Sequence, residues 1–130
     1  MPEKKTMDRA RQDAREGKAP STQAGEFVRE EMDHIREGKH GARSPQQAIA
    51  IGLSKARRAG IPLAPPSPGK TKKSTRVSAE RDYRKGQAGT TRKVSAKRSR
   101  ATEAALKKEP HSTVSHNALS AHAKKAAKAR

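Results

Sequence analysis

The chain has 130 residues, of which 31 are lysine or arginine and 13 are aspartate or glutamate, giving a formal net charge of +18 at pH 7. It contains no cysteine, which excludes disulfides, thiolate metal sites and cysteine nucleophiles. It also has no apolar run of about 18 residues and no apolar stretch near its charged start, so we expect neither a membrane span nor a signal peptide, and a cytoplasmic location.

Two helices are predicted first in the chain. Residues 3–16 are mostly good helix formers, and Gly17 is placed to end that segment. A second helix is expected to begin at Ser21 or Thr22, either of which can cap it, and to run to about Glu37. Its apolar face, at helical spacing, consists of Ala24, Phe27, Val28, Met32 and Ile35.

A third predicted helix has the clearest ends. Ser44 can cap its first turn, Pro45 fits the first helical position, and Gln47 completes a capping-box pattern. Gly60 is expected to end it, with Ile61 placed for the apolar contact of a Schellman motif. Residues 1–61 are therefore predicted to form a small helical hairpin or three-helix module.

The rest of the chain is predicted to have little core. Residues 62–76 contain four prolines, which is typical of a semi-extended linker. Leu, Ile, Val and Phe together number 13 in the whole chain, a low share for so charged a sequence. Residues 77–130 are thus expected to form a largely disordered, partly helical basic tail, with weak helices near 78–85, 95–109 and 115–129 separated at Gly86 and Pro110. The predicted fold class is mostly α.

The positive charge is concentrated in the second half. Residues 1–41 carry nine basic and nine acidic residues, whereas residues 70–130 carry eighteen basic and four acidic ones. A neutral module followed by a cationic tail is typical of proteins that bind polyanions. The predicted phosphate contacts are Arg57, Arg58, Lys70, Lys72, Lys73, Arg76, Arg92, Lys93, Lys97, Arg98, Arg100, Lys107, Lys108, Lys124, Lys125, Lys128 and Arg130.

Two of these contacts have an alternative interpretation. Arg57 and Arg58 lie at the predicted end of the third helix, where they can equally complement its dipole. The chain has one Phe, one Tyr and no Trp, so base stacking is largely excluded, which favours duplex DNA over single strands. RNA or ribosome association uses the same electrostatics. Besides DNA binding and RNA binding, a third interpretation is that the chain is an interaction or stress protein. In that case the hairpin of residues 21–60 docks a second copy or a protein partner.

Catalysis and metal binding are not expected. No nucleophile with a base and an orienting group stands out, so we predict that the chain is not an enzyme and has no cofactor. His111, His116 and His122 are five and six residues apart, which places them off any single helix face, and His34 and His40 flank a helix end. No cysteine completes a zinc-binding set, so no metal site is predicted.

Three segments carry a family resemblance. The segments EFVREEM (26–32), IREGKHGARSP (35–45) and AIAIGLSKARRAG (48–60), within residues 7–63, resemble small, basic bacterial proteins classed as a domain of unknown function. Some members carry labels such as DNA-binding or plasmid-stabilisation protein. The resemblance implies a bacterial cytosolic setting, and the Ala/Lys-rich residues 121–130 are similar to H1-type histone tails. We expect non-catalytic, largely sequence-independent DNA binding in a nucleoid-associated, histone-like role.

Overall fold

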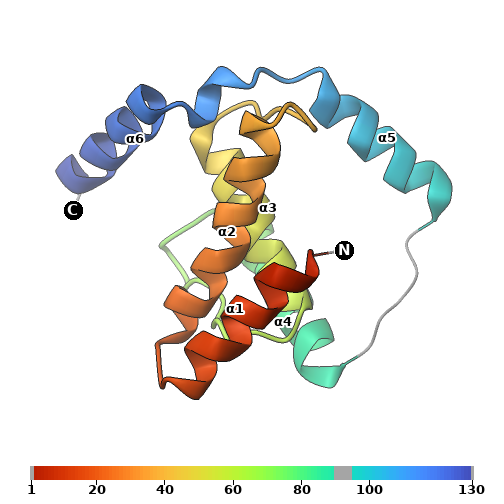
Figure 1. The fold of residues 1–130 in the computed structure, drawn as a ribbon. Helices are drawn as coiled ribbons and strands as arrows, with labels where there is room; N and C mark the ends of the chain where they lie inside the picture. Colours follow the sequence, from red (N-terminus) through yellow and green to blue (C-terminus); the bar gives the residue numbers. More distant parts are fainter. Residues whose placement is uncertain (1, 90–94, 130) are drawn as a thin grey trace. The chain divides into compact units, whose positions relative to one another are not determined.

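The computed structural model describes residues 2–89 and 95–129, and these residues are mostly helical (Figure 1). The predicted mostly-α class is therefore confirmed. The elements in chain order are α1 (Lys4–Arg15), α2 (Pro20–Arg36), α3 (Pro45–Arg58), α4 (Lys73–Ala88), α5 (Ala96–Lys107), the 3₁₀ helix η1 (Ser112–Val114) and α6 (His116–Lys128).

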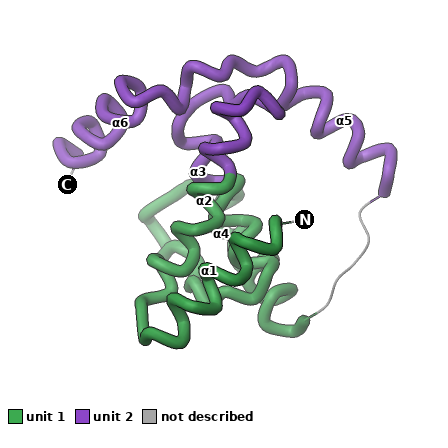
Figure 2. The backbone as a smooth tube through the Cα atoms, in the orientation of Figure 1, with its two compact units in different colours: residues 1–30, 51–92 green, residues 31–50, 93–130 purple. Residues whose placement is uncertain are grey.

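The chain divides into two compact units (Figure 2). Unit 1 comprises residues 1–30 and 51–92, and unit 2 comprises residues 31–50 and 93–130. Each unit thus combines an early segment with a late one, whereas the sequence suggested consecutive segments 1–61, 62–76 and 77–130. Helices α2 and α3 each contribute residues to both units.

Unit 1 holds a small apolar core around one aromatic ring. Phe27 is fully buried, with Ala10, Ala24, Ala56 and Ile61 around it. Met7, Leu53, Ala59 and Leu63 are partly buried and pack against this cluster. Because alanines make up much of the core, the helix backbones must approach closely to exclude water.

Helices α2 and α3 approach each other closely at Gly52 in unit 1. A Cβ atom on Gly52 of α3 would lie 2.6 Å from the Cα of Val28 on α2. Real Cβ atoms do not approach a backbone atom that closely, so only glycine fits at this crossing. The sequence pattern gave no indication of this role, because glycine inside a helix is usually unfavourable.

The start of α3 agrees with the prediction, but the start of α2 does not. Ser44 Oγ accepts a hydrogen bond from the Gln47 backbone N–H at 3.2 Å, and Gln47 Oε1 accepts one from the Arg43 N–H at 2.6 Å. Helix α2, however, already begins at Pro20, so neither Ser21 nor Thr22 is its cap. Proline suits the first turn because it has no N–H to leave unsatisfied.

The predicted end of α3 is confirmed. Gly60 has φ +98°, and the Ile61 N–H donates to the Ala56 carbonyl at 3.1 Å while the Gly60 N–H donates to Arg57 at 3.1 Å. This is the paired bonding of a Schellman motif. It turns Ile61, which is 8% exposed, into the core of unit 1.

The start of α1 is capped by a residue from α2. The buried Glu30 carboxylate accepts hydrogen bonds from the Glu3 backbone N–H at 2.6 Å and from Thr6 Oγ1 at 3.0 Å. A carboxylate at this end of a helix complements its positive dipole. This contact joins α1 to α2 within unit 1.

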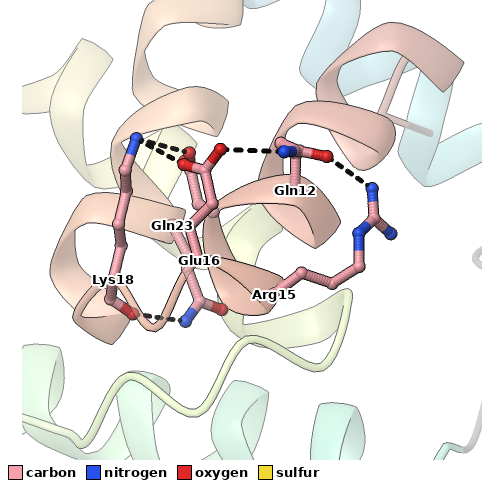
Figure 3. Close-up of polar contacts among 6 residues, drawn as sticks. Gln12, Arg15, Glu16, Lys18 and Gln23 are labelled. Atoms are coloured by element: carbon pink, nitrogen blue, oxygen red, sulfur yellow. Dashed lines mark hydrogen bonds and ion pairs between the residues drawn. The ribbon is translucent and has the colours of Figure 1, made fainter.

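Polar side chains hold the turn between α1 and α2 (Figure 3). Lys18 Nζ lies 3.3 Å from Asp13 Oδ1 and 3.1 Å from Glu16 Oε2. Gln23 Nε2 donates to the Lys18 carbonyl at 2.9 Å, which ties the start of α2 to the turn. Gln12 Nε2 extends the network by donating to Glu16 Oε1 at 2.8 Å.

A pair of carboxyl groups lies beside this turn. Burial raises the pKa of the Glu26 carboxyl above its ordinary value of 4.5, and hydrogen bonding and charge from Asp13 raise it further, against the influence of Arg9 and Arg29. The folded chain therefore keeps this proton to a higher pH than the unfolded chain. The resulting stability is present at acidic pH and is lost as the pH rises through the raised pKa.

Glu26→Gln is expected to stabilise the chain at pH 7 by about 1 kcal/mol, because the neutral amide can donate to Asp13 without carrying charge. The stability gained by wild type between pH 7 and pH 5 should shrink in this variant. Urea unfolding followed by circular dichroism at both pH values measures it. Glu16→Gln is the matched control, since Gln12 and Lys18 lower the pKa of Glu16, and a similar stabilisation in both variants would contradict the pairing.

The expected disorder of the tail is not confirmed in the part of it that the structure describes. Residues 96–107 and 116–128 are helical, and α4 begins at Lys73, which shortens the predicted linker. Ser95 Oγ caps α5 by accepting from the Arg98 N–H at 3.1 Å, and Ser115 Oγ caps α6 by accepting from the Ala118 N–H at 3.2 Å. Capping and the high helix propensity of alanine, lysine and arginine account for these helices without a large core.

Gly86 does not separate two helices as expected. It lies within α4, which continues to Ala88 and ends at Gly89. A Cβ on Gly86 would come within 3.0 Å of the Gly60 nitrogen and would also collide with the Arg57 carbonyl oxygen. The glycine is therefore explained by close packing of α4 against the end of α3 in unit 1.

In unit 2, the segment between α5 and α6 docks on the loop after α2 through its backbone. The Gly41 N–H donates to the Leu106 carbonyl at 2.8 Å, and the Ala42 N–H donates to the Pro110 carbonyl at 2.9 Å. Thr113 Oγ1 donates to the Ala42 carbonyl at 2.9 Å. These bonds explain why residues 106–114 follow a fixed path although only Val114 among them is fully buried.

Gly41→Ala is expected to release this docked segment. The added Cβ would lie 2.7 Å from the Pro110 carbonyl oxygen and closer still to Glu109, so the two backbones must separate. Amide hydrogen exchange at Ala42 should then accelerate by at least tenfold, which corresponds to about 1.4 kcal/mol of lost protection. Gly25→Ala provides a comparison in which the added Cβ meets no neighbour and the backbone is not left-handed, and unchanged exchange in Gly41→Ala would contradict the docking.

Candidate nucleic-acid interface

Most of the predicted phosphate contacts lie at the surface. Arg92, Lys93 and Arg130 lie outside the described residues. Arg76 is half-buried, 3.9 Å from Glu80 on the next turn of α4. The exposed contacts are Arg58, Lys70, Lys72, Lys73, Lys97, Arg98, Arg100, Lys107, Lys108, Lys124, Lys125 and Lys128.

Arg57 differs from the other predicted contacts that the structure describes, because only 8% of it is exposed. Its Nε and a terminal nitrogen donate to the carbonyls of Leu63 and Ala64, each at 3.2 Å. Burial lowers the pKa of its guanidinium, and Asp82 on α4 opposes that change. Arg57 therefore holds the chain that leaves α3, and we omit it from the proposed surface.

Both compact units carry a large positive charge. Unit 1 contains 18 basic and 8 acidic residues, and unit 2 contains 13 basic and 5 acidic ones, which gives +10 and +8. Of the exposed contacts, Arg58, Lys70, Lys72 and Lys73 belong to unit 1. The other eight belong to unit 2 and lie on or next to α5 and α6.

Helices α5 and α6 are unusual in having no buried residue at all. Lys97, Arg98 and Arg100 lie near the start of α5, where the helix dipole is positive and cations are unfavourable. On α6, Lys124, Lys125 and Lys128 are spaced to share one face. Anions close to these side chains would relieve the repulsion within both helices.

Unit 2 also contains a basic groove of about 430 Å³ between the start of α3, η1 and α6. Arg43, His122 and Lys125 are its ionisable residues, and none of the described residues that line it is acidic. The sequence did not place His122 here, since no pattern relates α6 to α3. The lining residues are Arg43, Ser44, Pro45, Gln46, Ser112, Thr113, Ala118, Ala121, His122 and Lys125.

A second set of polar side chains lies elsewhere in unit 2. One ligand atom from each of Glu31, His34 and His40 lies within 4.8 Å of the other two. This cluster was not predicted, because His40 lies in the loop after α2 and helix spacing does not relate it to His34. The turn after α2 brings His40 back toward Glu31 on that helix.

Comparison with known proteins gives no relative: no family model, curated protein or solved structure matches the chain. None of the helices in residues 2–89 and 95–129 combines the length and the apolar character that crossing a membrane requires. Function must therefore be argued from the charged surface itself.

Proposed function

We propose that this chain binds duplex DNA through its phosphates, without sequence specificity and without catalysis, as a nucleoid-associated accessory protein. The observation that carries the proposal is the pair of cationic helices, α5 and α6, in which no residue is buried.

Helices of this kind lack the usual source of helical stability in proteins, which is an apolar face packed on a core. A polyanion supplies a substitute, because phosphates neutralise the side chains and release condensed counterions. The groove with Arg43, His122 and Lys125 adds a concave place for the backbone of the polymer. Affinity is then electrostatic and independent of base sequence.

A duplex is favoured over single strands by the shortage of aromatic side chains. Phe27 is fully buried, Tyr83 is half-buried, and the chain has no tryptophan. Single-strand binding proteins depend on exposed rings that stack with bases. Neither aromatic ring of this chain is exposed for stacking with bases, so contacts with the phosphates dominate the proposed binding.

The test is a salt series with the full chain, a random-sequence DNA duplex and a structured RNA of similar length. If 6–10 phosphates are contacted, affinity for DNA should fall by about 10³–10⁵ between 50 and 200 mM salt. A flat salt response would contradict the proposal. Preference for the RNA at matched salt would replace DNA by RNA as the ligand.

A further inference from the structure

The end of α2 and the loop that follows it bring three metal-ligating side chains together. Glu31 and His34 are one helical turn apart on α2, and His40 follows the helix end at Gly38, where φ is +80°. Their nearest ligand atoms lie within 4.8 Å of one another. Glu31 is fully buried, and both histidines are half-buried.

The hydrogen bonds of His40 define what its ring presents to Glu31. His40 Nδ1 lies 2.9 Å from the Gly41 carbonyl oxygen, and since a carbonyl only accepts, Nδ1 carries a proton. Nε2 lies 3.1 Å from Glu31 Oε2. A neutral imidazole would therefore direct a lone pair at a carboxylate oxygen, so this contact requires either a proton between the two atoms, on the ring or on the carboxyl group, or a metal ion that both atoms bind.

The geometry also suits a metal ion. Zn²⁺ binds nitrogen and carboxylate oxygen at about 2.0–2.2 Å, which places two ligands of a tetrahedral site about 3.3 Å apart. The separation of 3.1 Å between Nε2 and Oε2 is close to that value. The His34 and His40 rings are nearly perpendicular with centroids 6.2 Å apart, which leaves both within reach of one ion.

We propose that Glu31, His34 and His40 bind a divalent transition-metal ion of the Zn²⁺ class. Two imidazole nitrogens and one carboxylate suit Zn²⁺, Co²⁺ or Ni²⁺, whereas Mg²⁺ and Ca²⁺ need a shell of oxygen ligands. The Gly41 carbonyl has the role of the outer partner that fixes the orientation of a ligating histidine. Three protein ligands leave a position for water.

Metal binding at this site would act on the docked segment of unit 2. The Gly41 and Ala42 N–H groups, next to His40, donate to the carbonyls of Leu106 and Pro110. His111 Nδ1 lies 3.0 Å from the Ile35 carbonyl oxygen on the same stretch of chain. An ion that fixes His40 therefore also fixes the loop on which residues 106–111 dock.

The test is a Zn²⁺ titration of the full chain in competition with a chromogenic chelator. One ion per chain is expected, and His40→Ala and Glu31→Gln should each weaken binding by more than tenfold. His116→Ala, at the exposed start of α6, is the matched control and should bind like wild type. Equal affinities of His40→Ala, Glu31→Gln and wild type would overturn the proposal, as would equal competition by Mg²⁺.

An NMR titration of the wild-type chain tests the metal site even if a variant does not fold. One equivalent of Zn²⁺ should move the imidazole ¹⁵N resonances of His34 and His40 and leave those of His116 and His122 in place. Co²⁺ should add visible absorption bands of a low-symmetry site. If Zn²⁺ instead moves only the resonances of the α6 histidines, or none, a proton alone joins His40 to Glu31 and the metal site is refuted.

Discussion

Replacing six cations of α5 and α6 by glutamine is expected to reduce the affinity of the full chain for duplex DNA by about 10³-fold or more at 0.15 M salt. Each phosphate contact contributes about 0.9 to the slope of log affinity against log salt, so the slope should become shallower by about 5. Fluorescence anisotropy across a salt series measures both quantities. The replaced residues are Lys97, Arg98, Arg100, Lys124, Lys125 and Lys128.

The matched control removes the same number of cations from exposed positions of α1 and α2. Its affinity should fall by less than tenfold, since those residues lie among acidic neighbours in the neutral part of the sequence. Equal losses in the two variants would mean that only total charge matters and that α5 and α6 form no specific surface. The control positions are Lys4, Lys5, Arg9, Arg11, Arg15 and Arg29.

Gly52→Ala is expected to destabilise unit 1 by about 3 kcal/mol, at the upper end of the usual cost of overpacking. The new Cβ would meet Val28 at 2.6 Å from its Cα and 2.9 Å from its nitrogen, so α2 and α3 must move apart. Since the core around Phe27 is small, such a loss is a large part of the stability of a small domain. Thermal unfolding followed by circular dichroism reports the change.

Gly25→Ala on α2 gives the opposite expectation for the same chemical change. Beyond the adjoining backbone of α2, no atom lies within 4 Å of a Cβ at Gly25, so alanine there should stabilise the helix by about 0.5–1 kcal/mol. If both variants were stabilised, α2 and α3 would not cross at Gly52 as described. If both were destabilised equally, the effect would not come from that crossing.

Helix ends were predicted well where the capping residue and the terminating glycine are adjacent to the helix in sequence. Ser44 and Gly60 bound α3 as expected, since a side-chain oxygen and a left-handed glycine act on backbone groups a few residues away. The cap of α1 could not be predicted in this way, because Glu30 comes from another helix. The position of Gly52 was missed for the same reason, as its meaning depends on Val28.

The candidate sites show a similar limit. The basic character of residues 70–130 was evident from composition alone, but the burial of Arg57 was not, since it depends on carbonyls at Leu63 and Ala64. The cluster of Glu31, His34 and His40 depends on a turn that reverses the chain after α2. Residue spacing along one helix face cannot predict a metal-ligating side chain, such as His40, that lies in the loop after the helix.

The docking of residues 106–110 on Gly41 and Ala42 implies that two kinds of force act independently in unit 2. Those docking bonds join uncharged backbone groups, which ions in solution hardly screen, whereas phosphate contacts weaken steeply as ions are added. If the chain binds DNA as proposed, rising ionic strength would therefore release the DNA while these docking bonds stay formed. Release and renewed binding of the DNA would then need no refolding of the segment that carries Lys107 and Lys108.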